Sequence, residues 1–178
     1  MSLPTVTQVL KPWADFSMVR PEVLAMAAER GTDAHRICAA ILRGLWVPSI
    51  PEDCRGFVLS FRSWLPFVQD IHLVEGELID PALGFAGHPD MIVTLKGDSR
   101  PAVIDLKTPA TKCRLWRAQL AAYKHLAIVN DWHVNRVASL RLKRDGSRPI
   151  FDEYTDSAQD MAAFTAALNA HRWFKQAT

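Results

Sequence analysis

The sequence predicts an α/β fold in which a small mixed β-sheet is flanked by helices, and three observations support this prediction. First, the apolar patterns follow the order helices, three strands, helix, strands, helix. Second, two apolar runs, MIVTL and AVIDL, flank the polar break KGDS, which is typical of a hairpin. Third, the long helical pattern CRLWRAQLAAYKHLAIVN stands between this hairpin and the next strands.

The composition suits one soluble domain. The chain has 178 residues, of which 49% are apolar, enough for a sizeable core. We expect a loosely held N-terminal arm over residues 1–20, which prolines interrupt, and a single domain over residues 21–178. No window approaches the roughly 18 consecutive apolar residues of a membrane helix, and no signal-peptide pattern is present. The odd, widely spaced cysteines argue against a disulfide framework and favour the cytoplasm: Cys38, Cys54 and Cys113.

The N-terminal helical text, PEVLAMAAERGTDAHRICAAILRGL, predicts two helices. Pro21 suits the first turn of the first helix. Gly31 is expected to separate the two, with Thr32 or Asp33 as N-cap of the second, which would end at Gly44. Another helix is expected within residues 53–69, because apolar side chains recur there at helical spacing: Phe57, Phe61, Trp64 and Leu65.

After this helix the pattern changes to that of strands. The text IHLVEGELID reads as an extended segment followed by a turn at DPALG, and the hairpin around KGDS comes next. The text VNRVASLRLKRDGSRPIFDEYT predicts a second hairpin, with Asp145–Gly146 as its turn signal. A final helix is expected from SAQDMAAFTAALNAHRWFKQ, with Asp156 or Ser157 as its N-cap.

Charge is distributed unevenly along the chain. Residues 1–90 hold 7 Lys/Arg and 11 Asp/Glu, whereas residues 91–178 hold 14 and 8. Residues 100–148 alone carry 11 basic side chains against three acids. Such a basic stretch is a candidate surface for a polyanion such as a nucleic acid, and the alternative is an ordinary solvated face.

An acid stands in each strand of the predicted KGDS hairpin, Asp90 before MIVTL and Asp105 within AVIDLKT. If the hairpin is centred between Gly97 and Asp98, opposed residues have numbers that add to the same total, so Asp90 faces Asp105. The side-chain period of two puts Lys107 on the same face. Opposed Cβ atoms lie about 4.5–5.5 Å apart, so the two carboxylates would repel each other in a half-buried sheet.

A divalent cation would offset this repulsion. Mg²⁺ takes carboxylate oxygens and keeps several waters, and a bound metal can activate a water and neutralise charge on a scissile phosphate. Lys107 would point at the same place, where it could orient the attacking water or stabilise developing charge. The alternative is a cross-strand ion pair of Asp105, Lys107 and Asp90 at the sheet surface, without a metal.

The stretch from Pro89 to Lys107 begins with Pro-Asp and, 14 residues further on, ends with Asp-Leu-Lys, and it resembles the signature of the PD-(D/E)XK nuclease superfamily. Three more stretches resemble the RecB-type branch of that superfamily. RGTDAHRI is similar to its first motif, VEGELIDPALGFAGHPD to its pattern of a Glu, a turn and a glycine before the metal-binding Asp, and WRAQLAAYKHL to its QxxxY helix. The trailing Arg-rich hairpin and final helix resemble the ends of phage-type RecB-like exonucleases. The resemblance implies a restriction-endonuclease-like core.

The resemblance also implies roles for individual residues. Asp90 and Asp105 would bind the metal, Leu106 would offer its backbone carbonyl to it, and Lys107 would be the catalytic lysine. His35 would be an additional metal ligand from the first motif, and the alternative is a plain helical histidine.

Glu75 would be the upstream acid, because it lies nine residues before Gly84 and so fits the family spacing better than Glu77. A surface role is the alternative for Glu75. Gln119 and Tyr123 lie one turn apart on one helix face, where they could contact DNA phosphate or brace the catalytic residues. Tyr123 could equally be core, with its hydroxyl satisfied locally.

Basic residues on this helix or at its entry would contact DNA phosphates: Arg114, Arg117 and Lys124. Trp116 and Trp132 could stack on bases, although a tryptophan on a helix face is more often part of the core.

The function that the resemblance implies is a Mg²⁺- or Mn²⁺-dependent deoxyribonuclease, in the first place an exonuclease of bacterial or phage DNA recombination, repair or processing. DNA is the expected partner, together with further copies in a ring or a recombination or annealing protein. An iron–sulfur cluster is not expected, because three scattered cysteines cannot supply its four ligands. Two alternatives stay open, a non-catalytic DNA-binding or recombination-accessory module on the same fold and a DNA endonuclease. The sequence leaves polarity and the choice among single-stranded DNA, double-stranded DNA and RNA open.

Overall fold

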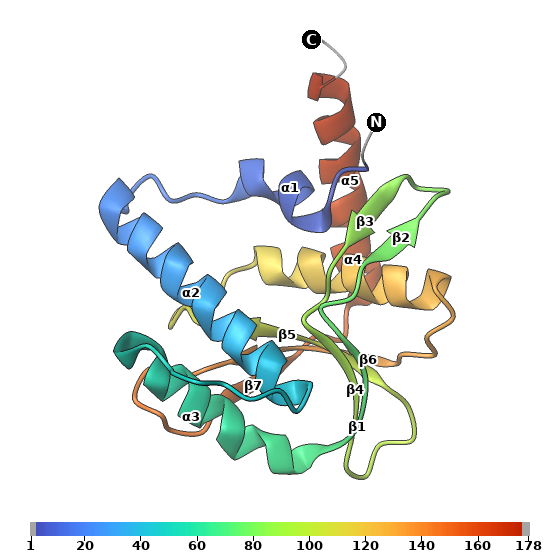
Figure 1. Cartoon of the computed structure of the whole chain (residues 1–178). Coiled ribbons are helices and arrows are strands. Elements are labelled where there is room, and N and C mark those ends of the chain that lie inside the picture. The colour runs from blue at the N-terminus through green and yellow to red at the C-terminus, as the bar shows by residue number, and fades with distance from the viewer. Residues whose placement is uncertain (1–2, 176–178) are drawn as a thin grey trace.

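The structure, a computed structural model that describes residues 3–175, is built on a five-stranded mixed sheet with helices against both faces (Figure 1). The strand order is β1-β4-β5-β6-β7, and all neighbours are antiparallel except β5 and β6, which are parallel. The predicted fold class, α/β with a small mixed sheet flanked by helices, is confirmed, and the arrangement is consistent with a restriction-endonuclease-like core. The strands are β1 Val68–Val74, β2 Leu78–Asp80, β3 Phe85–Gly87, β4 Met91–Leu95, β5 Ala102–Lys107, β6 Arg136–Arg141 and β7 Ile150–Glu153.

Helices cover the sheet from two sides. Helices α1, α4 and α5 pack on the face that carries Ile92 and Val103, whereas α2 and α3 pack on the face that carries Met91 and Ile104. Helix α4 forms the crossover that joins the parallel strands β5 and β6. No helix within residues 3–175 is long and apolar enough to cross a membrane. The helices are α1 Val6–Leu10, α2 Pro21–Leu42, α3 Arg55–Trp64, α4 Leu115–Val129 and α5 Ser157–Lys175, with short 3₁₀ turns η1 Lys11–Trp13, η2 Glu52–Cys54 and η3 Leu65–Phe67.

The N-terminal segment differs from the loosely held arm that the sequence suggested. Thr5 and Gln8 form a reciprocal capping box that starts α1. Val6 and Val9 are completely buried and belong to the same apolar cluster as α4 and α5. Residues 5–10 are therefore held by the core, and the segment that follows them lies beside α4 (Figure 1).

Helix α2 is continuous, whereas the sequence predicted two helices separated at Gly31. Thr32, which was expected to cap a second helix, instead donates its hydroxyl hydrogen bond to the carbonyl of Ala28 one turn earlier, at 3.0 Å. A Cβ at position 31 would lie 3.3 Å from Oγ1 of Thr108, which follows β5. The glycine therefore serves close packing of the helix on the end of β5 and does not mark a helix end.

The hairpin of β4 and β5 has the register that the sequence predicted. Met91 pairs with Ile104 and Ile92 with Val103, so that the position of Asp90 is opposite Asp105 by the same register. The preceding strand prediction was wrong in one respect. The text IHLVEGELID is not one extended segment, because Glu75 has a φ of +47° and breaks the chain into β1 and β2.

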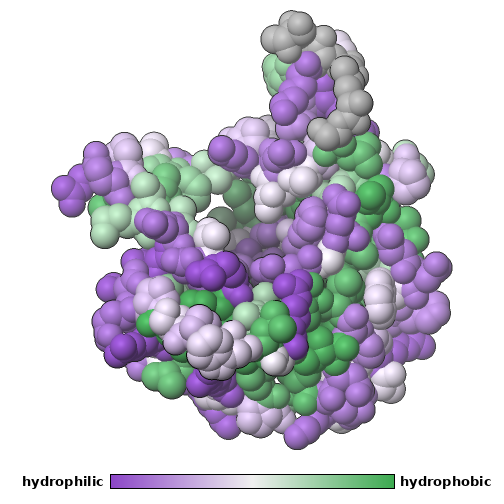
Figure 2. Space-filling view, viewed as in Figure 1, coloured by the Kyte–Doolittle hydropathy of each residue, from purple (hydrophilic) through white to green (hydrophobic). Residues whose placement is uncertain are grey.

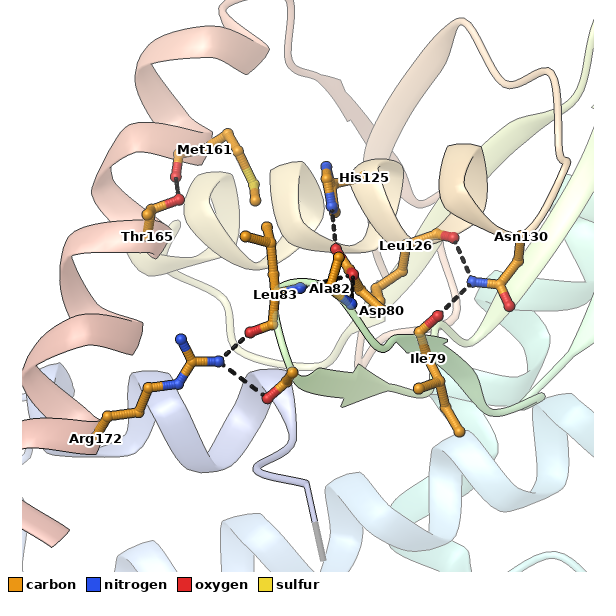
Figure 3. Close-up of polar contacts among 11 residues, drawn as sticks. Ile79, Asp80, Ala82, Leu83, His125, Leu126, Asn130, Met161, Thr165 and Arg172 are labelled. Carbon is orange, nitrogen blue, oxygen red and sulfur yellow. Dashed lines mark hydrogen bonds and ion pairs between the residues drawn. The ribbon is translucent and has the colours of Figure 1, made fainter. Parts of the chain in front are cut away.

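The small sheet of β2 and β3 is anchored to two helices (Figure 3). The Asp80 carboxylate accepts hydrogen bonds from the backbone N–H groups of Ala82 and Leu83, each at 2.8 Å. His125 Nε2 on α4 donates to the same carboxylate at 2.6 Å. Arg172 on α5 donates to the carbonyl of Leu83. These contacts fix the turn before β3, the strand that leads into β4.

Candidate active site

The acids and the lysine that the sequence singled out meet at the middle of the sheet. Asp105 and Lys107 come from β5, the central strand, and Asp90 immediately precedes β4. His35 reaches them from α2 and Gln119 from α4. Helices α2 and α4 lie on opposite faces of the sheet (Figure 1). The cluster therefore forms between them, where the start of β4 meets the end of β5.

Asp90 is held by one side-chain and one backbone donor. His35 Nδ1 donates to Oδ1 of Asp90 at 2.9 Å, and the Leu106 N–H donates to Oδ2 at 2.6 Å. Burial would raise the pKa of Asp90, but the His35 imidazole, these hydrogen bonds and the nearby Lys107 ammonium outweigh it and lower this pKa. Burial would lower the pKa of His35, but the Asp90 carboxylate reverses the shift and raises it. Asp90 is therefore kept ionised.

The pKa of Asp105 shifts in the opposite direction to that of Asp90. Its side chain is buried, with only 3% of the residue exposed, and burial raises its pKa to about 6 against the Lys107 ammonium. The neighbouring Asp90 carboxylate adds to the rise. Lys107 Nζ lies 2.5 Å from Oδ2 of Asp105, but this oxygen accepts no hydrogen bond of good geometry. A pair of close carboxylates with their pKa values pushed apart is typical of a functional site.

A short polar chain connects Lys107 to α4. The Lys107 ammonium donates to Oε1 of Gln119 at 2.8 Å, and Nε2 of Gln119 donates to the Tyr123 hydroxyl at 3.2 Å and to Asp105 Oδ1 at 3.5 Å. Burial raises the pKa of Tyr123, so its hydroxyl stays protonated. The structure thus brings Gln119 and Tyr123 together with the acids, and Gln119 fixes the position of the lysine.

Gly87 makes this arrangement possible. A Cβ at this position would lie 2.8 Å from Cε1 of Tyr123 and 2.7 Å from Cδ1 of Leu126, closer than real Cβ contacts. Glycine therefore lets β3 pack directly on α4, where it supports the Tyr123 ring. This is the glycine of the GHPD text three residues before Asp90.

A divalent metal fits the donor set of this cluster. Asp105 Oδ2 is a buried carboxylate oxygen without a hydrogen bond, and Asp90 supplies a second carboxylate. Carboxylate oxygens are ligands that Mg²⁺ and Mn²⁺ prefer. Residues 3–175 contain no group of three or more His, Cys, Asp or Glu side chains placed to surround a metal. The fit therefore depends on the two acids. His35 and the backbone N–H of Leu106 are both hydrogen-bonded to Asp90.

The structure does not bring the upstream glutamates into this cluster. Glu75 is exposed, and its backbone N–H donates to the carbonyl of Asp90 at 3.0 Å. Glu77 is also exposed, and its carboxylate lies 3.8 Å from Nε2 of His88. The two acids lie in the turn between β1 and β2, where the sequence predicted an extended segment. Only the backbone of Glu75 contacts Asp90.

Two of the three predicted phosphate contacts are engaged within the protein. Arg117 Nε donates to both Asp160 oxygens at 2.9 and 3.1 Å, and Lys124 donates to Oγ of Ser157 at 3.3 Å. Both side chains therefore tie α4 to α5. Arg114, at the start of α4, is exposed to solvent.

The two tryptophans considered for stacking lie in different places. Trp132 is partly buried against the core and beside His72, with 5.8 Å between ring centroids. Trp116 is buried on α4, and its ring centroid lies 5.5 Å from the Lys107 ammonium. Trp116 therefore adjoins the acid cluster, whereas Trp132 supports the far end of the helix.

A cavity of about 490 Å³ opens beside Lys107 and Gln119, between α4 and the N-terminal segment. The prolines in residues 1–20 suggested a loose arm with no part in the site. The capping-box spacing of Thr5 and Gln8 is the signal that could have revealed an ordered helix there. The other polar side chains of the cavity include those of Thr7, Gln8, Lys11 and Asp15.

Comparisons with known proteins assign no family. No family model matches the sequence, and no curated protein matches it. Among solved structures, the chain is similar to an alkaline exonuclease (LHK-Exo) from Laribacter hongkongensis, with 17% identity, a TM-score of 0.40, and coverage of 97% of this chain and 91% of the other. It is also similar to a protein named SSO0001, with 21% identity and a TM-score of 0.39. That match covers 66% of this chain and spans 61% of the length of SSO0001. We therefore argue the function from the site itself.

Proposed function

We propose that the protein is a metal-dependent deoxyribonuclease of the PD-(D/E)XK type that hydrolyses phosphodiester bonds. The observation that carries this proposal is the close pair of the buried Asp105 and the largely buried Asp90, with Lys107 against Asp105, where α2 and α4 supply His35 and Gln119. Two buried acids at close range are costly in a sheet unless they serve a cation. A structural ion pair would need only one of them.

Asp90 and Asp105 would hold Mg²⁺ or Mn²⁺, with His35 and the Leu106 carbonyl as further ligands. The metal, when bound, would supply a more acidic water and neutralise charge on the phosphate. His35 keeps Asp90 ionised and fixes its rotamer. The charge of a bound cation would favour the ionised form of Asp105, so that both acids would be ionised in the metal complex.

Lys107 would act on the phosphate or on the attacking water. Its ammonium is held between Asp105 and Gln119, so its position is fixed before substrate arrives. A fixed cation beside a scissile phosphate stabilises the negative charge that develops in the transition state. Tyr123 would act as a positioning residue, because its hydroxyl holds the Gln119 amide.

Exonuclease action in bacterial or phage DNA recombination, repair or processing is the finer part of the proposal. A cytoplasmic location, a ring of identical subunits and a recombination or annealing partner are further predictions. Arg114 is the exposed candidate for a phosphate contact. Arg117 and Lys124 would have to break their contacts with Asp160 and Ser157 of α5 before they could bind a phosphate. Sedimentation of the full chain with and without DNA would test the ring.

Digestion of end-labelled linear and circular DNA, single- and double-stranded, with Mg²⁺, Mn²⁺ or EDTA tests the function. We expect metal-dependent loss of linear DNA that Asp105→Ala and Lys107→Ala abolish. Lys96→Ala, which removes an exposed lysine at the β4–β5 turn, is the matched control and should cleave normally. Cleavage of circular DNA would identify an endonuclease. DNA binding without any cleavage, unaffected by Asp105→Ala, would contradict the proposal and favour an accessory module.

A further inference from the structure

The cavity beside Lys107 has the size and position of a ligand site. Its volume of about 490 Å³ lies within the range of roughly 300–1,000 Å³ that small-molecule sites occupy. Figure 2 shows the surface hollowed next to the segment that joins α1 to α2. The walls come from α1, from that segment, from α4 and the residue Cys113 before it, and from Lys107 at the end of β5. The side chains that matter for recognition are Gln8, Lys11, Phe16, Lys107, Trp116 and Gln119.

The cavity is continuous with the acid cluster. Lys107 and Gln119 line it, and the same two side chains hold Asp105. The Lys107 ammonium lies 2.5 Å from Oδ2 of Asp105 and 5.5 Å from the Trp116 ring centroid, so it separates the carboxylates from an aromatic wall. A molecule that fills the cavity would therefore reach the phosphate position proposed above.

The groups on the walls would complement a flat aromatic ligand that has polar edges and a negative charge at one end. Trp116 forms one wall, and Phe16 is 52% exposed at the rim although it is apolar. The Gln119 amide is engaged with Lys107, Asp105 and Tyr123, and Oε1 of Gln8 accepts from the Thr5 N–H, so the amide NH₂ of Gln8 is the group that could donate to the edge of a base. Lys107 supplies positive charge beside the acid cluster, and Lys11 supplies it on the N-terminal segment, where Asp15 carries the opposite charge. Stacking on aromatic side chains is how proteins bind unpaired bases of any sequence.

The acidic side chain of the cavity sets the direction of such a ligand. The Asp15 carboxylate accepts a hydrogen bond from the Ser17 backbone N–H at 3.0 Å, and it would repel a phosphate. Asp15 and Phe16 lie together on the N-terminal segment, at the opposite wall from Lys107. The phosphate is therefore assigned to the Lys107 end and the base to the Phe16 side.

We propose that this cavity binds one unpaired nucleotide of the substrate, with its base against Phe16 and Trp116 and its phosphate toward Lys107. The proposal rests on the proposed nuclease function and makes it more specific. A base in a duplex cannot enter such a cavity until it leaves its stack, which costs a few kcal/mol. The preferred substrate is therefore a single strand or an unpaired end.

Binding of two labelled probes in EDTA, measured by fluorescence anisotropy on the full chain, tests this proposal. One probe is a hexamer of thymidylate, and the other is a hexamer with the same backbone and abasic sites in place of the bases. Their charges are equal, so the difference between their affinities reports the bases. We expect the thymidylate probe to bind about 10-fold more tightly, as stacking of one base predicts.

Two variants locate that difference. Phe16→Ala removes an exposed ring and should retain the fold, and it should bring the affinities of the two probes within about twofold of each other. Trp46→Ala, which removes a ring that is 84% exposed in the loop after α2, is the matched control and should keep the 10-fold difference. Equal binding of the two probes by the unmodified protein, or a difference that Phe16→Ala leaves intact, would overturn the proposal.

The outcomes separate this proposal from the nuclease function. If Asp105-dependent cleavage is observed and the bases make no difference to binding, the nucleotide site is wrong and the function stands. If the bases matter through Phe16 and no cleavage is seen with Mg²⁺ or Mn²⁺, the function is wrong and the nucleotide site stands.

Discussion

The molecule contains two pairs of a histidine and a buried aspartate, and they differ in what surrounds the acid. In both pairs, His35–Asp90 and His125–Asp80, the histidine donates to the carboxylate and backbone N–H groups complete the contact. In both pairs, the pKa of the aspartate is lowered although burial opposes this. The histidine–aspartate contact alone therefore does not identify a functional site.

The neighbours of the two aspartates distinguish them. Asp80 accepts two backbone N–H groups at one oxygen and His125 at the other, so both oxygens are satisfied, and the pair anchors a turn to α4 (Figure 3). Asp90 instead stands opposite a second acid, Asp105, whose pKa burial raises to about 6 and whose Oδ2 accepts no hydrogen bond. The second acid beside Asp90, with its raised pKa and its ion pair to Lys107, indicates chemistry at this pair, whereas the absence of such a neighbour among the contacts described for Asp80 indicates a structural role there.

The largest expected difference between the two pairs is in catalysis. Asp90→Asn should lower metal-dependent DNA cleavage by roughly 10²–10³-fold, because it removes charge at the metal and the phosphate. Asp80→Asn, the same change at the other pair, should leave the rate within about fivefold of the unmodified protein, since the site geometry is set mainly by β4, β5 and α4. Initial rates on one labelled substrate at saturating Mn²⁺ measure both. Equal losses in the two variants would remove the distinction.

Stability should show the reverse order, with a smaller effect. Asp80→Asn should lower the free energy of unfolding by about 2 kcal/mol, since it weakens a charge-assisted hydrogen bond and leaves the turn less well held. Asp105→Asn should change it by less than about 1 kcal/mol, because the substitution removes a carboxylate that repels its neighbour. Urea unfolding of the two variants in EDTA gives the comparison. A larger loss in Asp105→Asn than in Asp80→Asn would show that Asp105 is chiefly structural.

The pH dependence of stability should have opposite signs at the two acids, and this is the smallest expected effect. The folded pKa of Asp80 lies below its ordinary value of 3.8, so its contribution is complete above that value and is lost as pH falls through the folded pKa. The folded pKa of Asp105 is raised from 3.8 to about 6, so its ionisation costs stability as pH rises through this window.

Unfolding midpoints of the unmodified protein and each variant between pH 3 and pH 8 in EDTA test these signs. The advantage of the unmodified protein over Asp80→Asn should shrink as pH falls below about 4. Relative to Asp105→Asn, the unmodified protein should lose stability between pH 4 and pH 6. A pH-independent difference in either comparison would contradict the corresponding shift.

The hairpin of β4 and β5 and the placement of its acids could be predicted from local sequence patterns. Strand periodicity and the KGDS turn were enough to place Asp90 opposite Asp105 and to turn Lys107 to the same face, because the side-chain period of two leaves one register for a buried hairpin. The spacing of Gln119 and Tyr123 on one helix face was equally local, and the two side chains are hydrogen-bonded. Patterns of this kind depend only on neighbours along the chain.

Only the tertiary structure decided how distant segments meet. Gly31 looked like a helix end, but it lies inside α2. The close approach of Thr108 explains why a glycine suits this position. Arg117 and Lys124 looked like free cations, but acids and hydroxyls of α5 engage them. Residues 1–20 looked like a loose arm, but Val6, Val9 and Leu10 belong to the core, and residues from Thr7 to Phe16 line the cavity next to Lys107. These outcomes depend on contacts between residues far apart in sequence, which no local pattern encodes.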